Sequence, residues 1–219
     1  PSIAGEFEDI TDYRKFVQMI RALGFAFVHE ASFGADLVAL QYLRLLEESK
    51  GKFYISSNCP AVVSYVEKYH PGLTSNLAPI VSPMIATARV LRDMYGDRVR
   101  LVYIGPCIAG KDEAEAFGPD PGIDAVLTFT ELRKLFRLHG IDETRLEYSE
   151  FDPPLGHKGA LFPLPEGMLE AAGIDRSLLS GKVISVEGPA GMLRSVEEFG
   201  SNITSIQHHF NLFYCEGCI

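Results

Sequence analysis

The sequence predicts an α/β protein with two lobes of mostly parallel sheet flanked by helices. Apolar residues make up 47% of the 219 residues, which is enough for a substantial core. Short apolar runs alternate with segments of helical apolar spacing, and this alternation is typical of parallel sheets covered by helices. The turn-forming segment Phe117 to Gly122 predicts a first lobe over residues 1–116 and a second over residues 117–219.

Helices and strands alternate from the first predicted element onward. Thr11 is the expected N-cap of the first helix, and Pro60 stands at a first-turn position, where its missing N–H costs nothing. The helices predicted in the first half cover residues 12–23, 35–48, 60–69 and 83–95. The strands predicted there cover residues 25–29, 53–56 and 98–104.

The second half continues the same alternation around one long irregular stretch. Strands are predicted at 124–128 and 183–186, with a short strand-like segment at 212–214, and helices at 131–139 and 192–199. Residues 148–165 are rich in Pro and Gly, and a loop of this length inside a compact domain is usually functional or lid-like.

Composition excludes several classes of function. The net charge is −9 and no run of Lys or Arg stands out, so we expect no nucleic-acid partner. No apolar run approaches the roughly 20 residues of a membrane helix, so we expect no membrane partner. The first residues lack the basic-then-apolar pattern of a secretory signal. The expected location is cytoplasmic.

The cysteine count points to a metal site. The sequence holds four cysteines, Cys59, Cys107, Cys215 and Cys218, which is too few for a disulfide scaffold in a chain of this length. Four thiolates, two of them in a Cys-x-x-Cys pair, equal the ligand count of a tetrathiolate metal or cluster site. Unrelated core cysteines are the alternative on count alone.

The positions of the cysteines strengthen the metal interpretation. Cys59, Cys107 and Cys215 each follow a predicted strand, and ligands of parallel α/β sheets bind beyond the carboxyl ends of strands. Cys59 also precedes a helix, where free N–H groups lower the pKa of a thiol. Zinc sites usually use two close Cys or His pairs, whereas Cys59 and Cys107 are isolated. The pattern therefore favours an iron–sulfur cluster at a seam between the lobes.

The cysteine segments resemble motifs of the catalytic domain of iron-only hydrogenases. Ser56 to Val62 is similar to that family's Thr-Ser-Cys-Cys-Pro-x-Trp, and Gly105 to Glu113 to its Met-Pro-Cys-x-x-Lys-Lys-x-Glu. The pair Cys215 and Cys218 resembles its Cys-x-x-x-Cys, one residue shorter. Weaker matches support these: Phe33 to Leu37, Ser82 to Met84, Asp124 to Thr128 and Gly167 to Ala172. The resemblance covers roughly residues 17 to 218.

The resemblance implies a cofactor and its ligands. In that family two βαβ-rich lobes surround a [4Fe-4S] cluster, and one cysteine bridges to a di-iron subsite carrying carbonyl and cyanide. By position, Cys59, Cys107, Cys215 and Cys218 would be the ligands, with Cys218 as the candidate bridge. The residues expected around these ligands are Asn58, Lys111, Glu113 and Ser82.

Departures from the family pattern fall where hydrogen chemistry needs specific groups. The family's proton-relaying cysteine is replaced by Asn58, whose amide does not titrate near neutral pH. A serine of the proton path corresponds to Ala78. A lysine that donates to cyanide corresponds to Gly110, with Lys111 as the residue that could reach in its place. These changes argue against a loaded di-iron subsite.

The sequence therefore predicts a cluster-binding, hydrogenase-like domain that serves redox sensing or electron relay within a larger protein. The expected partner is a redox protein or a fused ferredoxin or signalling domain; the sequence does not predict the oligomeric state. One alternative is an active iron-only hydrogenase that reduces protons to H2. Another is an iron–sulfur assembly or interaction scaffold. We interpret His208 and His209 as core or solvated histidines.

Overall fold

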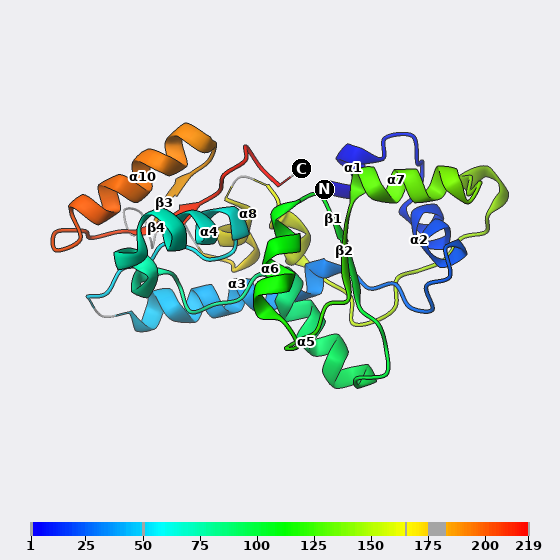
Figure 1. The fold of residues 1–219 in the computed structure, drawn as a ribbon, viewed down its shortest axis with the longest axis horizontal. Helices are drawn as coiled ribbons and strands as arrows, with labels where there is room; N and C mark the ends of the chain where they lie inside the picture. The colour runs from blue at the N-terminus through cyan, green and yellow to red at the C-terminus, as the bar shows by residue number, and fades with distance from the viewer. Residues whose placement is uncertain (1, 50, 165, 175–182, 219) are drawn as a thin grey trace.

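The computed structural model describes residues 2–49, 51–164, 166–174 and 183–218 (Figure 1). The helices are α1 (Ser2–Glu6), α2 (Tyr13–Ala22), α3 (Ala31–Glu48), α4 (Pro60–Tyr69), α5 (Pro83–Tyr95), α6 (Ala109–Phe117), α7 (Phe129–Leu138), α8 (Gly167–Ala171) and α10 (Pro189–Ser201). Short 3-10 turns lie at Pro71–Asn76, Glu143–Arg145 and Lys158–Leu161. The strands are β1 (Val102–Gly105), β2 (Ala125–Thr128), β3 (Val183–Val186) and β4 (His209–Leu212).

Two parallel strand pairs confirm the predicted α/β class. β1 pairs with β2, with Val102 opposite Ala125, and β3 pairs with β4, with Val183 opposite His209. In the view of Figure 1 the β3–β4 pair lies toward the end that holds α10, whereas the β1–β2 pair lies nearer the middle, between α6 and α7. Parallel strands have to be connected by long crossovers, and helices supply these here.

The β3–β4 pair is extended by the segment around Ile55. Ile55 forms parallel bridges to Phe210 on one side and to Leu77 on the other. The Phe210 N–H donates to the Tyr54 carbonyl at 2.8 Å, and the Ser56 N–H donates to the Phe210 carbonyl at 2.7 Å. Residues 53–56 were predicted as a strand; they run parallel to β4, but only Ile55 forms bridges.

Local signals fix several helices where they were predicted. α4 and α5 each begin at a proline, as expected, and α5 is capped by Ser82, whose Oγ accepts from the Ile85 N–H at 3.4 Å. α7 begins two residues before the predicted helix because Thr128 and Glu131 form a capping box. The cap of α2 is Asp12 and not Thr11: the Asp12 carboxylate accepts from the Arg14 N–H.

The predicted strand over residues 25–29 is wrong. Its Val28 N–H donates to the Asp152 side chain at 2.7 Å, and the Asp152 N–H donates to the Val28 carbonyl at 2.8 Å. Val28 therefore bonds to the single loop residue Asp152 and not to a neighbouring strand, so no β-ladder forms. Residues 98–101 also precede the observed start of β1, and β4 ends at Leu212, where the strand-like segment was predicted to begin.

Two buried clusters hold the two ends of the molecule. One joins α4 and α10 to the β3–β4 pair through Ile55, Val62, Met192, Phe199 and Leu212. The other joins α2 to α7 and is built largely from phenylalanines. Each cluster draws on both halves of the sequence, and the division at residues 116 and 117 stays a prediction. Among the described residues, no helix is long and apolar enough to cross a membrane.

Replacing Phe199 tests the first cluster. The ring of Phe199 is 1% exposed and packs edge-on against Phe210 at 5.3 Å between ring centroids. We expect Phe199→Ala to lower the free energy of unfolding by about 3–5 kcal/mol, because the change removes buried area and leaves a cavity. Urea unfolding measures the loss. Leu138→Ala, at a site 78% exposed, is the control and should stay within about 0.5 kcal/mol of the parent.

Candidate metal centre

Cys59 and Cys215 are brought to one edge of the β3–β4 sheet. Cys59 follows the Ile55 bridge and is the N-cap of α4, while Cys215 follows β4. Burial raises the pKa of the Cys59 thiol, and the N–H groups of Tyr214, Val62 and Ala61 oppose that rise by hydrogen bonding. The expected lowering of this pKa by the helix start is therefore outweighed by burial.

Cys107 reaches the same place from the other sheet. It follows β1 and precedes α6, so it also lies beyond the carboxyl end of a strand. Burial raises the pKa of its thiol, and the N–H groups of Ala109 and Gly110 act in the opposite direction. Charge on Cys59 raises this pKa further, which places the two thiols in one electrostatic environment.

Cys218 completes the group. Burial first, and then the charges of Cys59, Cys107 and Cys215, raise the pKa of its thiol to about 12. Its N–H donates to the Pro163 carbonyl at 2.9 Å, and its carbonyl accepts from Ser2 Oγ at 2.8 Å. All four cysteines are free thiols, and the effect of Cys59, Cys107 and Cys215 on the pKa of Cys218 indicates that the four predicted ligands lie in one region. Their role as ligands stays a prediction.

The donor set fits an iron–sulfur cluster. Within the described residues, no three His, Cys, Asp or Glu side chains are arranged to hold a single metal ion. A multi-iron core tolerates a wider spacing, because each thiolate binds a different iron atom. Mutual repulsion and burial keep these thiols protonated, and bound iron reverses that balance by favouring the thiolates.

Ser82 and Glu113 lie together beside Cys107. Burial raises the pKa of Glu113 to about 7, with a hydrogen bond from Ser82 acting in the opposite direction. The charge of Glu113 in turn raises the pKa of Cys107. Both residues line a cleft of about 310 Å³ between α4 and α6, which Ala78 also lines. Two of the predicted surrounding residues are thus close to the cysteines.

Lys111 points elsewhere. Its ammonium lies 2.6 Å from a carboxylate oxygen of Glu131, at the start of α7. That carboxylate also caps α7, so Lys111 is anchored to the helix start and not directed at the thiols. Packing does not require glycine at position 110, because a Cβ added to Gly110 would make only ordinary contacts with Met84 and Val126 at 3.7 Å.

Asn58 is buried without partners. Its side chain is 6% exposed, and neither its amide nitrogen nor its amide oxygen has a hydrogen-bond partner. An unpaired buried donor or acceptor costs about 1–3 kcal/mol. Within the described residues it is the one side chain with two such atoms, and it directly precedes Cys59.

Two further residues at this site were not predicted. Glu187 follows β3, and its carboxylate accepts from the Gly217 N–H at 3.1 Å and raises the pKa of Cys218. Tyr103, in β1, is partly buried, and burial first, then the charges of Cys107, Glu113 and Cys218, raises the pKa of its phenol. The rule that ligands gather beyond strand ends could have found Glu187. No sequence signal marks Tyr103.

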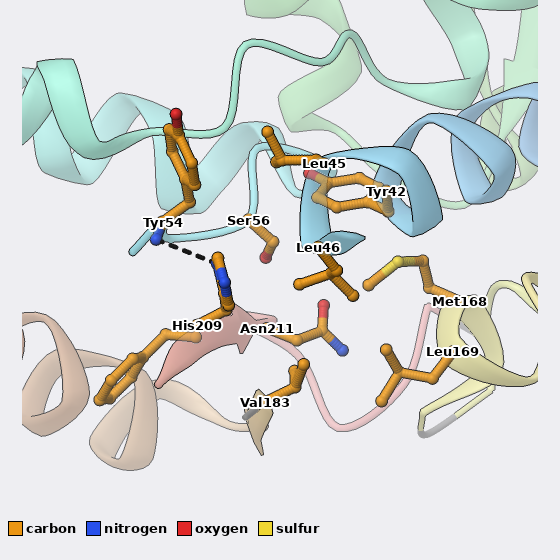
Figure 2. Close-up of a pocket in the computed structure, with 11 residues that line it drawn as sticks. Tyr42, Leu45, Leu46, Tyr54, Ser56, Met168, Leu169, Val183, His209 and Asn211 are labelled. Carbon is orange, nitrogen blue, oxygen red and sulfur yellow. Dashed lines mark hydrogen bonds between the residues drawn. The ribbon is translucent and has the colours of Figure 1, made fainter. Parts of the chain in front are cut away.

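His209 has a structural place away from the thiols. Its ring accepts from the Tyr54 N–H at 3.3 Å and lies 3.2 Å from Ser49 Oγ (Figure 2). Beside it lies a cavity of about 20 Å³, large enough for one water, into which the Asn211 amide projects (Figure 2). The interpretation of His209 as a core histidine agrees with these contacts.

Free thiols beyond the ends of parallel α/β strands are typical of the iron–sulfur class of proteins. The family described as "Iron only hydrogenase large subunit, C-terminal domain" matches residues 1–217, and the chain belongs to it. No organism or activity follows from that membership alone.

Similar proteins fall into two groups. The chain is 32% identical over 176 residues to "Iron hydrogenase 1" of Clostridium pasteurianum, covering 72% of this chain and 31% of that protein. It is 26% identical over 163 residues to "Cytosolic Fe-S cluster assembly factor NAR1" of Yarrowia lipolytica, covering 63% of this chain and 33% of that protein. The chain thus spans about a third of the length of these relatives.

A solved structure shares the fold. The [FeFe]-hydrogenase HydA1 of Chlamydomonas reinhardtii superposes with a TM-score of 0.74 at 20% identity, over 99% of this chain and 75% of that one. The likeness confirms the predicted iron-only hydrogenase-like fold.

Glu113 should give the cofactor-free protein a measurable pH dependence. Its pKa is about 7 in the folded protein, above the ordinary glutamate value of about 4.5 in the unfolded chain, so between these values the folded protein holds a proton that the unfolded chain has released. This contribution to stability is complete below about pH 4.5 and falls as the pH rises through 7, by up to about 3 kcal/mol.

The Glu113→Gln variant should lose this pH-dependent contribution to stability. Urea unfolding at pH 5 and pH 8 gives the difference for each protein, and the difference should shrink in this variant. Glu115→Gln changes an exposed residue of the same helix and serves as the control. Equal differences in the parent and Glu113→Gln would contradict the assignment.

Proposed function

We propose that this chain binds one [4Fe-4S] cluster through Cys59, Cys107, Cys215 and Cys218 and uses it for electron relay or redox sensing. It would act as one domain of a larger cytoplasmic protein. The natural partner is a redox protein, or a ferredoxin-like or signalling domain in the same polypeptide. A cluster supplies one-electron chemistry, and the protein sets its potential through burial, charge and hydrogen bonds.

The observation that carries this proposal is the mutual charge interaction of the four thiols. The charge of each of the other three cysteines raises the pKa of Cys218, although Cys59 and Cys107 follow segments of different sheets. Cysteines that are brought together from separate segments could each bind an iron atom of one cluster.

The positions expected to relay protons, Asn58 and Ala78, carry no titratable group. Asn58 has an amide that does not titrate, and Ala78 is a buried methyl group that is 4% exposed. Gly110 offers no charge, and Lys111 is paired with Glu131. These features favour electron transfer over hydrogen chemistry and argue against a loaded di-iron subsite bridged by Cys218.

An iron–sulfur assembly role is the second candidate. The similarity to NAR1 of Yarrowia lipolytica, at 26% identity, supports it, since that relative carries the fold under the name of an assembly factor. Transfer of the cluster to an apo-ferredoxin would distinguish this role from electron relay, in which the cluster stays bound while its charge changes.

Hydrogenase activity is the third candidate, supported by 32% identity to Iron hydrogenase 1. Infrared spectra recorded after anaerobic maturation distinguish a hydrogenase from the protein that we propose. Bands of iron-bound carbonyl and cyanide, together with H2 formation, would replace our proposal by this one. We expect neither.

Anaerobic reconstitution with iron and sulfide tests cluster binding. The parent should take up about four iron atoms and turn brown. Cys59→Ser and Cys107→Ser should lose most of this iron, because each change removes one of the four thiolates. Lys111→Ala is the matched control: its side chain pairs with Glu131, so this variant should keep the full iron content. Unchanged iron in both cysteine variants would refute the ligand assignment.

A further inference from the structure

The starting observation is that Asn58 is trapped in the interior with a whole amide unpaired. Its nitrogen and oxygen are both buried and lack partners, and the side chain is 6% exposed. An amide offers two N–H donors and one carbonyl acceptor, and burying it unpaired costs the folded state free energy. The folded protein needs a compensating partner for such a group.

The backbone around Asn58 prevents escape to solvent. The Ser57 N–H donates to Tyr42 Oη at 2.8 Å, and Ser57 Oγ donates to the Ile80 carbonyl at 2.5 Å. On the other side, Cys59 caps α4, where its carbonyl accepts from the Val62 N–H at 3.0 Å. Asn58 is therefore held between two fixed residues, and its amide has to be satisfied where it lies.

A second buried amide, that of Asn211, is paired at its nitrogen only, and its oxygen lacks a partner, whereas both atoms of the Asn58 amide lack one. The Asn211 nitrogen donates to Ser185 Oγ at 3.3 Å, and its side chain lines the water-sized cavity beside His209 (Figure 2). Asn58 lines neither that cavity nor the cleft between α4 and α6. Its neighbour in sequence is Cys59, one of the four thiols that interact at the candidate centre.

We propose that the Asn58 amide donates a hydrogen bond to a sulfur atom of the iron–sulfur cofactor and thereby raises its reduction potential. The inference rests on the proposed cluster binding. Cluster sulfides and thiolates are acceptors without protons, so they complement the unpaired N–H groups of Asn58. A donor near the sulfur stabilises the additional negative charge of the reduced cluster. Asn58 is thus a positioning and tuning residue of the centre.

Two variants isolate this role. Asn58→Leu keeps the approximate size and removes the donor, whereas Asn58→Ser keeps a donor. After anaerobic reconstitution of the full chain, at a fixed potential near the midpoint, Asn58→Leu should lower the ratio of reduced to oxidised cluster about tenfold, which corresponds to about 59 mV for one electron. Asn58→Ser should recover part of the loss. Spectroelectrochemical titration measures both.

Stability without the cofactor gives a second, independent result. The cofactor-free Asn58→Leu variant should unfold at a higher temperature than the parent, because an unpaired amide is removed. The control Asn211→Leu, which breaks the bond to Ser185, should unfold at a lower temperature and leave the cluster potential unchanged.

The outcomes separate this inference from the proposed function. A parent chain that takes up no cluster overturns both. A cluster that binds normally and has the same potential in the parent and in Asn58→Leu overturns the role of Asn58 alone, and so does a cofactor-free Asn58→Leu variant that is less stable than the parent.

Discussion

The arrangement of the whole site depends on one parallel register, that between the Ile55 segment and β4. Phe210 is hydrogen bonded to both Tyr54 and Ser56, and the Leu212 N–H donates to Ser56 Oγ at 3.0 Å. Cys59 lies three residues beyond Ser56, and Cys215 lies three residues beyond Leu212. Because parallel strands end at the same edge, this register brings two thiols together from segments more than 150 residues apart in sequence. A slip by one residue would turn each side chain to the opposite face.

The charge interactions at the centre oppose the stability of the folded protein, although they suit the proposed function. Four thiols, of which Cys59 is buried, Cys107 and Cys218 are partly buried and Cys215 is exposed, raise one another's pKa values, and Glu187 and Glu113 add negative charge nearby. Lys111, the cation expected beside these thiols, pairs with Glu131 instead. A fold that accepts such crowding, together with an unpaired Asn58, violates the usual rules for a stable interior at one place, as functional sites do. Bound iron would relieve both conflicts.

Membership of the iron-only hydrogenase family is consistent with this arrangement, and the residues around the thiols are the basis on which we propose electron relay or redox sensing and not hydrogen chemistry. The thiols are retained, and the positions expected to move protons carry an amide and a methyl group at Asn58 and Ala78. The relatives include proteins named as hydrogenases and as assembly factors, so the shared fold supports more than one use of a cluster. The choice among them lies in the immediate surroundings of the sulfur atoms.

The sequence by itself determined the elements whose signals are local. Pro60 and the Ser82 cap fix the starts of α4 and α5, and β3 was predicted with its observed bounds. Placing cysteines after strands predicted where the site lies, because strand ends share an edge in any parallel sheet. Only the tertiary structure decided which segment pairs with β4, that residues 25–29 find one loop residue and no strand, and that Lys111 turns to Glu131. It also decided that Asn58 is buried without a partner. These outcomes depend on contacts between residues distant in sequence, which local propensity and spacing do not encode.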